Sequence, residues 1–143
     1  MQIRAATLED SPAIARLLTV LGYLSSTDCV TFKIQQFLAH PDAQVLVAVE
    51  TDQVLGFVAF NFIPQLGLVG DFCRISYFCV DETAQGRGIG TALEKSVSAL
   101  AKDRGCDRME VHCHSRRKLA HQFYYRQGYT ESPKYLVKSL VQP

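Results

Sequence analysis

The sequence contains no long apolar run that would cross a membrane. A bilayer-spanning helix needs about 20 consecutive, mostly apolar residues, and no such stretch occurs in the 143 residues. The first ten residues, MQIRAATLED, carry two acids and an arginine where a secretory signal has an apolar block. We therefore expect a cytoplasmic protein with no membrane partner.

The sequence also has no marked excess of charge of either sign. Its 15 Lys and Arg residues nearly balance its 14 Asp and Glu residues, which gives a formal net charge of +1. Proteins that bind polyanions carry a basic surplus, so we expect no nucleic-acid partner. A content of 48% hydrophobic and 20% charged residues excludes a disordered chain. The length fits a single domain over residues 1–143.

Cysteine pairs at metal-binding spacing are absent as well. The five cysteines are scattered and include no C-x-x-C pair, which favours reduced thiols over a disulfide framework or a zinc knuckle. A zinc site formed by His112, His114 and Cys106 is disfavoured, because two histidines on one strand face do not complete a tetrahedral shell. We expect no metal, and we expect Cys79 and Cys113 to be small core hydrophobes rather than nucleophiles.

What the chain does contain is a regular succession of helix and strand patterns. Helices are predicted after the capping signals at residues 7–10 and 26–27, after the glycines of residues 86–90, and over residues 116–127. Strands are predicted at residues 2–6, 44–50, 54–63, 72–80 and 108–114, with a terminal strand pair formed by 129–130 and 135–140. The strand-helix-strand segment 72–114 demands a parallel crossover. The predicted fold is α/β, with a central mixed sheet and helices on both faces.

The most informative stretch is VDETAQGRGIGT at residues 80–91, between a predicted strand and an amphipathic helix. A helix N-terminus presents unpaired N–H groups and partial positive charge, and glycines let an anion such as pyrophosphate reach them. Arg87 adds a full charge. The alternative is a tight turn whose glycines only permit positive φ. The spacing matches neither the dinucleotide fingerprint nor the P-loop, which excludes Rossmann cofactors and nucleotide hydrolysis.

Two motifs in this sequence resemble signatures of the GNAT family of N-acetyltransferases. Gln85-x-x-Gly88-x-Gly90, after a strand ending at Val80, resembles the family's acyl-CoA motif Q/R-x-x-G-x-G/A. Residues 120–129, AHQFYYRQGY, are similar to the family's A-x-x-F-Y-x-x-x-G-[FY] helix and following strand. The order of predicted elements also agrees, so the resemblance covers nearly the whole chain.

The resemblance implies a GNAT acyl-CoA N-acyltransferase fold, with acetyl-CoA bound where the fourth and fifth strands splay apart. It implies that backbone groups of Phe78, Cys79 and Val80 bind the pantetheine arm. It implies that the pyrophosphate is held by the loop amides of Gln85, Gly86, Arg87, Gly88, Ile89, Gly90 and Thr91. Tyr124 matches the tyrosine that faces the thioester sulfur in many members. Arg117 stands where many members carry asparagine, and with Arg116 and Lys118 it is a candidate to contact the CoA phosphates.

Acetyl transfer to an amine needs a neutral amine, support for the oxyanion and a proton for the leaving thiolate. For the oxyanion, a backbone N–H at a strand bulge near Cys79 would suffice. For the thiolate, Tyr124 is the candidate donor, because a phenol of pKa ~10 can protonate a thiolate within hydrogen-bond reach. The alternative is that Tyr124 is a packed aromatic. For the amine, alternation places Glu110, His112 and His114 on one strand face as a proton wire, with Glu110 as the candidate base. The alternative is that these side chains meet water or pair with helix residues.

The acceptor pocket is expected in the irregular segments 23–32 and 62–74. Candidate residues there are Tyr23, Asp28, Phe62, Leu66, Asp71 and Arg74. Asp28 and Asp71 would attract a cationic amine, whereas Arg74 would recognise a carboxylate, which leaves the charge of the acceptor open. The sequence predicts an N-acetyltransferase that moves an acetyl group from acetyl-CoA directly to a primary amine of a small molecule or peptide. The alternative is an inactive acyl-CoA-binding sensor or scaffold, and related folds suggest a homodimer.

Overall fold

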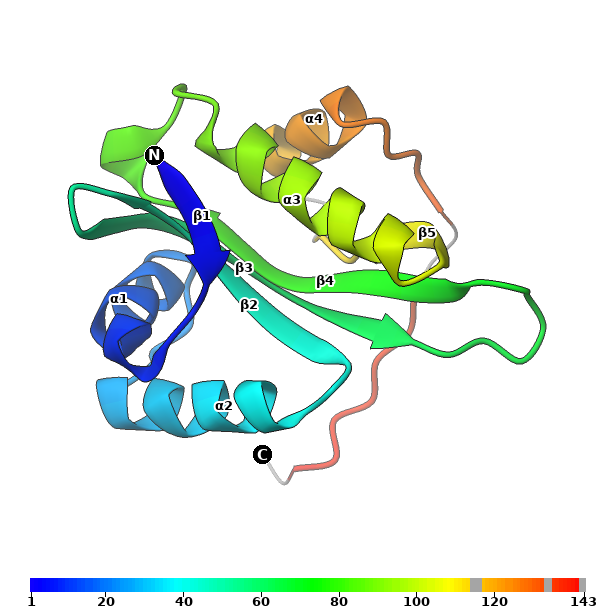
Figure 1. Ribbon diagram of the computed structural model, residues 1–143, viewed down its shortest axis with the longest axis horizontal. Coiled ribbons are helices and arrows are strands. Elements are labelled where there is room, and N and C mark those ends of the chain that lie inside the picture. The colour runs from blue at the N-terminus through cyan, green and yellow to red at the C-terminus, as the bar shows by residue number, and fades with distance from the viewer. Residues whose placement is uncertain (114–116, 133–134, 142–143) are drawn as a thin grey trace. The chain divides into compact units, whose positions relative to one another are not determined.

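The computed structural model describes residues 1–113, 117–132 and 135–141, and the chain forms two units, Met1–His112 and Cys113–Pro143. The first unit holds a five-stranded sheet in the order β1-β2-β3-β4-β5 (Figure 1). Its strands are β1 Gln2–Ala5, β2 Ala43–Glu50, β3 Gln53–Ile63, β4 Asp71–Val80 and β5 Cys106–Val111. Neighbouring strands are antiparallel except β4 and β5, which are parallel. The predicted mixed sheet is therefore confirmed.

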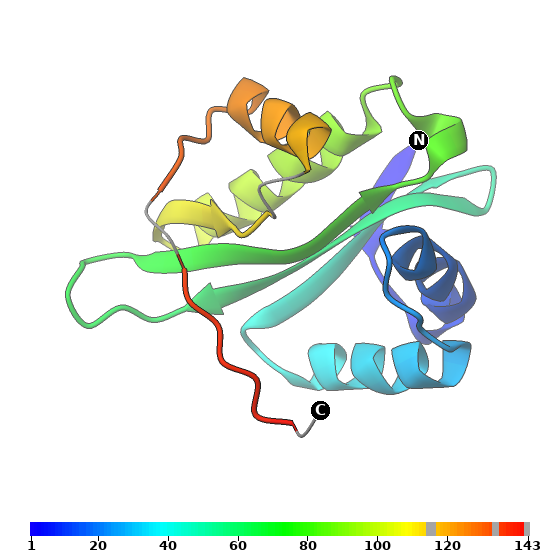
Figure 2. The ribbon, with the colours of Figure 1, turned by 180° about the vertical axis from the view of Figure 1, so that it is seen from behind.

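Helices cover both faces of this sheet, as predicted (Figures 1 and 2). One face carries α1 (Ser11–Val20) and α2 (Thr27–Ala39), and the other carries α3 (Ile89–Asp103). Each face has its own apolar core. Short 3-10 turns, η1 (Leu8–Asp10) and η2 (Glu82–Ala84), precede α1 and α3. The sequence signals at the helix ends are confirmed, since the N–H of Cys29 donates to the capping Ser26 hydroxyl at 3.1 Å.

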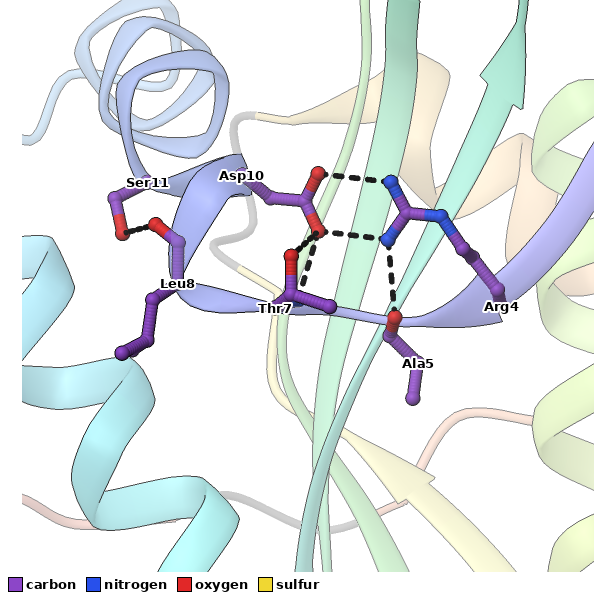
Figure 3. A network of polar contacts seen from close by, with 6 residues as sticks. All are labelled: Arg4, Ala5, Thr7, Leu8, Asp10 and Ser11. Carbon is purple, nitrogen blue, oxygen red and sulfur yellow. Dashed lines mark hydrogen bonds and ion pairs between the residues drawn. The ribbon is translucent and has the colours of Figure 1, made fainter. Parts of the chain in front are cut away.

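A buried carboxylate ties β1 to the start of α1 (Figure 3). Asp10, whose side chain is 6% exposed, accepts the Thr7 N–H at 2.8 Å, as the predicted capping box requires. Arg4 donates to both Asp10 oxygens, at 2.8 and 3.0 Å. The bidentate pair fixes where the chain turns from strand to helix. The sequence pattern predicted the cap but not its arginine partner.

A β-bulge divides β4 into two halves. Ile75 lies opposite Phe60 and Tyr77 opposite Ala59, so Ser76 is an extra residue on β4. The bulge reverses the side-chain alternation, because Ile75 belongs to the core under α3 whereas Cys79 belongs to the core under α1 and α2. The prediction of a bulge near Cys79 is wrong in position. A bulge depends on strand register, which the sequence pattern does not reveal.

The two halves of β4 also differ in their pairing with β5. The ladder joins Asp71–Ile75 of β4 to β5, and β5 ends at Val111. Among the described residues, 76–80 have no strand partner on that edge. The predicted splay between the fourth and fifth strands corresponds to this point.

The fifth strand is displaced from its predicted range. It begins at Cys106 and ends at Val111, so His112 and Cys113 follow the strand rather than belonging to it. The predicted placement of His112 on the strand face is therefore wrong, and His114, the other histidine of the predicted proton wire, lies outside the described residues.

The second unit contains the helix α4, Lys118–Arg126. It begins after Arg117 rather than at residue 116, which lies outside the described residues. The predicted terminal strand pair is wrong, because the described parts of 129–141 contain no strand. The apolar side chains there are largely exposed, from 60% at Tyr135 to 90% at Leu136. An alternating pattern forms a strand only where a neighbouring strand satisfies its backbone.

Candidate functional site

The loop between β4 and α3 leaves open space above the first turn of the helix. Gly86 and Gly88 have φ values of +78° and +80°. A Cβ added at either position would meet no atom within 4 Å. The tight-turn alternative is thus correct for the backbone conformation, but close packing does not explain these two glycines. The space above them remains available to a ligand.

The backbone amides of this turn precede the hydrogen-bond ladder of α3. The first helical bond runs from the N–H of Ala92 to the C=O of Gly88, at 3.0 Å. The N–H groups of Ile89 and Gly90 therefore lie ahead of any acceptor supplied by the helix itself. Together with the positive end of the helix dipole, this arrangement suits an anion.

Two ion pairs flank the loop. Arg16 of α1 contacts Asp81 at 2.6 Å, and Asp81 also accepts the N–H of Thr83. Nη2 of Arg87 lies 2.7 Å from both carboxylate oxygens of Glu50, at the end of β2. The hydrogen bond from Arg87 lowers the pKa of Glu50 below its ordinary value. The charge expected from Arg87 is present, but it already has a partner.

The second half of β4 presents backbone groups on its splayed edge. The N–H of Asp81 donates to the C=O of Leu55 on β3 at 2.7 Å. Because successive residues of a strand alternate, Cys79 also directs its backbone to β3, whereas Phe78 and Val80 direct theirs to the other edge. The Gln85 side chain lies 3.5 Å from the C=O of Val80. The placement of Phe78 and Val80 thus agrees with the expected pantetheine contacts, and that of Cys79 does not.

A pocket of about 370 Å³ opens beside the β4 bulge. Its lining includes His40, Asp42, Asn61, Phe62, Arg74 and Ser76. Phe62 and Arg74 were expected in an acceptor pocket, whereas Asp28 and Asp71 do not line it. Tyr23 instead packs edge-to-face on Tyr77, with 5.2 Å between ring centroids, and Leu66 is fully exposed.

The sequence analysis missed four of the pocket residues, His40, Asp42, Asn61 and Ser76. They come from the α2–β2 connection, the end of β3 and the bulge. Such residues meet only after the strands have paired. The chain pattern at His40-Pro41 signals the end of a helix and carries no sign of a pocket.

Glu110, the predicted base, has an arginine partner on the neighbouring strand. It lies opposite Arg74 in the parallel ladder. Arg74 donates from Nε at 3.1 Å and from Nη2 at 2.8 Å, both to the same oxygen, Oε1. Glu110 is thus a paired carboxylate, although its partner lies on a strand and not on a helix as the alternative supposed, and a base function would have to work within this pair.

A second arginine contacts two residues of the pocket lining, Asp42 and Phe62. Arg104, at the end of α3, forms an ion pair with Asp42 and donates to the C=O of Pro41 at 3.2 Å. Its guanidinium lies 4.2 Å from the centroid of the Phe62 ring. The N–H of Asp42 donates to Nδ1 of His40 at 3.0 Å. These contacts hold the α2–β2 connection against the ends of β3 and α3.

Within the second unit, Tyr124 is buried in an aromatic cluster. Its ring packs edge-to-face on Phe123 at 5.3 Å and on Tyr129 at 5.4 Å between centroids. Burial raises the pKa of its phenol well above the usual 10, and the Cys113 thiol adds to this while Arg117 opposes it. The side chain is therefore a neutral proton donor at physiological pH. Its packing agrees with the structural alternative, and its protonation agrees with the proposed role as a donor.

The buried cysteines are poor nucleophiles. Burial, with a smaller contribution from Cys106, raises the pKa of the Cys73 thiol to about 12. Burial also raises the pKa values of Cys106 and Cys113. Cys79 is buried, and its sulfur lies 3.6 Å from the C=O of Leu17. A thiol that keeps its proton does not readily form an acyl-enzyme.

The described residues contain neither a metal-binding cluster nor a membrane-spanning helix. Over residues 1–113, 117–132 and 135–141, no group of three His, Cys, Asp or Glu side chains is placed to hold a metal ion. No helix in the described part of the chain combines the length and the apolar character needed to cross a membrane.

Comparison with known proteins identifies the family. A sequence model described as the Acetyltransferase (GNAT) family matches residues 12–129. A curated relative, the aminoalkylphosphonate N-acetyltransferase of Salmonella typhimurium LT2, is 25% identical over 141 residues, which cover 97% of this chain and 91% of the relative.

Solved structures share the fold. A transcriptional regulator from Bacillus halodurans C-125 has a TM-score of 0.89 at 23% identity, with 97% of this chain and 99% of that one covered. A putative acetyltransferase from Agrobacterium tumefaciens C58 has a TM-score of 0.88 at 20% identity, with 97% and 100% covered. The chain belongs to the GNAT family of acetyltransferases, which confirms the family and fold predicted from its two signatures.

Proposed function

We propose that this protein transfers an acetyl group from acetyl-CoA to the primary amine of a small molecule. The observation that carries the proposal is the open first turn of α3. Its glycines at 86 and 88 hold positive φ without any packing need, and the backbone amides of Ile89 and Gly90 precede the helical ladder. A diphosphate is the anion that such a turn accommodates, and acetyl-CoA carries one next to its pantetheine arm.

Acetyl-CoA binding would use three parts of the chain. The amides of residues 85–91 would hold the diphosphate, and the splayed edge of β4 at Phe78 and Val80 would bind the pantetheine arm as an added strand. Arg87 would exchange its contact with Glu50 for a contact with phosphate. Arg117, at the start of α4, is proposed as a further phosphate contact.

The reaction itself is direct transfer. The amine nitrogen attacks the thioester carbonyl, the C–S bond breaks, and the thiolate takes up a proton. A primary alkylamine with a pKa near 10.4 is neutral in only about 1 molecule in 2,500 at pH 7, so the site must favour the neutral form. The β4 bulge is proposed to stabilise the oxyanion through a backbone N–H, because a bulge disrupts the ladder locally.

Ser76 lies where the proposed oxyanion site at the bulge meets the pocket proposed for the amine. It is the bulged residue of β4, and it also lines the pocket of about 370 Å³. An acetyl carbonyl at the bulge would therefore meet an amine bound in the pocket. The proposed donor for the thiolate is Tyr124, whose phenol is protonated, and the proposed base is Glu110, acting within its pair with Arg74.

The curated relative supports the class of reaction. Its name describes N-acetylation of an aminoalkylphosphonate, a small molecule that carries a primary amine. The pocket volume also favours a small acceptor over a peptide, since it lies at the lower end of the range of roughly 300 to 1,000 Å³ for small-molecule sites.

A second candidate function is that of an acyl-CoA-binding sensor without turnover. The pairing of Glu110 with Arg74 favours it, because the carboxylate proposed as base is already engaged. A thiol-release assay with acetyl-CoA and a panel of amines separates the two. We expect CoA-SH release that depends on the amine. Saturable binding of acetyl-CoA without release on any amine would overturn the transferase and support the sensor.

A further inference from the structure

We infer that the pocket beside the β4 bulge selects an amine that also carries an anionic group, a carboxylate or phosphonate, and that Arg74 and His40 bind this group. The inference rests on the proposed transferase function and adds the charge of the acceptor. That charge is the property that the sequence left open.

Arg74 has donor capacity that its ion pair does not use. Its side chain is 41% exposed and lines the pocket. Nε and Nη2 both donate to one oxygen of Glu110, and within the described residues no hydrogen bond engages Nη1. A guanidinium presents its donors as a planar fork that matches an oxyanion. Arg74 therefore has N–H groups left for a second anion.

His40 adds a neutral donor to the same pocket. The backbone N–H of Asp42 donates to Nδ1 of His40 at 3.0 Å, so Nδ1 acts as an acceptor. The proton of the neutral ring then lies on Nε2. In this tautomer His40 is a hydrogen-bond donor and not a base, which suits it to an anion rather than to an ammonium group.

The acids near the pocket are already paired. Asp42 forms its ion pair with Arg104, and Glu110 forms its pair with Arg74. Asp28 and Asp71, the acids that would have favoured a cationic acceptor, do not line the pocket. A cationic group would have to break an existing pair, whereas an anion meets donors with remaining capacity.

The same pairing of the acids favours the neutral amine. Because Asp42 and Glu110 are engaged by arginines, the amine gains little by staying protonated in the pocket, and the neutral form is the one that attacks. The Ser76 hydroxyl donates its proton to the C=O of Ala59 at 3.2 Å. Toward a bound amine, the Ser76 oxygen can therefore act only as a hydrogen-bond acceptor. The anionic group thus provides the binding energy, and the amine is left to react.

The test compares acceptors of similar length on the full chain with saturating acetyl-CoA. The probes are 3-aminopropanoate, 2-aminoethylphosphonate and propylamine, and the measurement is kcat/KM for CoA-SH release at one pH. We expect each anionic amine to exceed propylamine by about tenfold or more, the size of effect typical of a charge-assisted hydrogen bond. A preference for one anionic amine over the other identifies which oxyanion the pocket prefers.

Variants of Arg74 and His40 test whether these side chains cause the preference for anionic amines. Arg74→Gln should lower kcat/KM for both anionic amines by about tenfold more than for propylamine. His40→Ala, at an exposed position, should reduce the same preference by a smaller factor and tests the inference even if Arg74→Gln does not fold. The matched control is Arg108→Gln, which removes a guanidinium of β5 that stacks on Phe72 at 4.4 Å. In Arg108→Gln, the preference for the anionic amines over propylamine should equal that of the wild type.

The outcomes separate the two proposals. No release with any amine would overturn the transferase and the inference together. Release that is equal or greater with propylamine would overturn the inference and leave the transferase standing. Equal loss for all three amines in both Arg74→Gln and His40→Ala would also overturn it.

Discussion

Arg87 holds both carboxylate oxygens of Glu50 at 2.7 Å, so the arginine of the glycine loop is neutralised by the end of β2. Both side chains are close to half exposed. Such a surface pair is weak and exchanges easily with water or another anion. A phosphate that approaches the loop therefore competes with Glu50 for Arg87.

The first prediction concerns this competition. Glu50→Gln should tighten acetyl-CoA binding by roughly two- to fivefold at low ionic strength, because Arg87 no longer has to leave a carboxylate. The gain should shrink as salt screens the charges. Because Arg87 lowers the pKa of Glu50, the wild-type pair is intact above the ordinary Glu pKa of 4.5 and is lost as pH falls through the lowered value. Isothermal titration at two salt concentrations measures the effect.

The control for this prediction is Glu82→Gln. It removes an equal charge from η2, in the loop that carries Arg87, without touching the pair between Arg87 and Glu50. An equal gain in acetyl-CoA affinity in both variants would mean that the gain comes from removing any negative charge near the loop, and that the ion pair has no specific role.

The second prediction concerns Gly88. Gly88→Trp should abolish acetyl-CoA binding, because the side chain would fill the open space above the amides of α3. Gly105, at the other end of the same helix, has almost the same backbone conformation, with φ +81° against +80°, and equally open surroundings. Gly105→Trp should therefore cost similar stability but leave binding intact. Unchanged affinity in Gly88→Trp would remove the cofactor assignment.

The third prediction concerns the Arg4–Asp10 pair. Burial alone would raise the pKa of Asp10, but hydrogen bonds from Arg4 and Thr7 outweigh it and hold the pKa below the ordinary 3.8. A lowered pKa contributes stability above pH 3.8 that is lost as pH falls through the folded value. Asp10→Asn should cost about 1–3 kcal/mol near neutral pH, and less in acid.

Urea unfolding at pH 7 and near pH 3 measures this difference. Glu9→Gln is the control, since Glu9 is the neighbouring exposed acid and lies outside the capping box of Thr7 and Asp10. A constant cost at both pH values would show that Asp10 acts through shape alone and not through its charge.

Much of the fold could be predicted because its signals are local. The cap before α1, the serine before α2 and the glycine after α3 are short patterns read from neighbouring residues. The glycine loop was equally visible, since its chemistry depends on backbone conformation within a few residues. Family and sheet type follow from such patterns, and so does the position of the glycine loop.

The partners of the site could not be predicted, because they depend on register. Glu110 contacts Arg74 because the β4–β5 ladder places the two residues side by side. Ser76 lines the pocket because the bulge shifts the register of β3 and β4 by one residue. Arg87 and Glu50 are 37 positions apart in the chain. The terminal strand pair could not be predicted correctly because an alternating pattern does not show whether a neighbouring strand is present, and the described parts of 129–141 contain no strand.

The last prediction concerns Tyr124. If the phenol donates its proton to the departing thiolate, Tyr124→Phe should lower kcat by about a hundredfold, the lower end of general-acid effects, with little change in the KM for acetyl-CoA. Because burial raises its pKa well above 10, activity should show no fall from phenol ionisation up to pH 10. Tyr125→Phe is the matched control, since the neighbouring side chain is 52% exposed. A loss of melting temperature in proportion to the loss of activity would instead make Tyr124 a packing residue of the cluster with Phe123 and Tyr129.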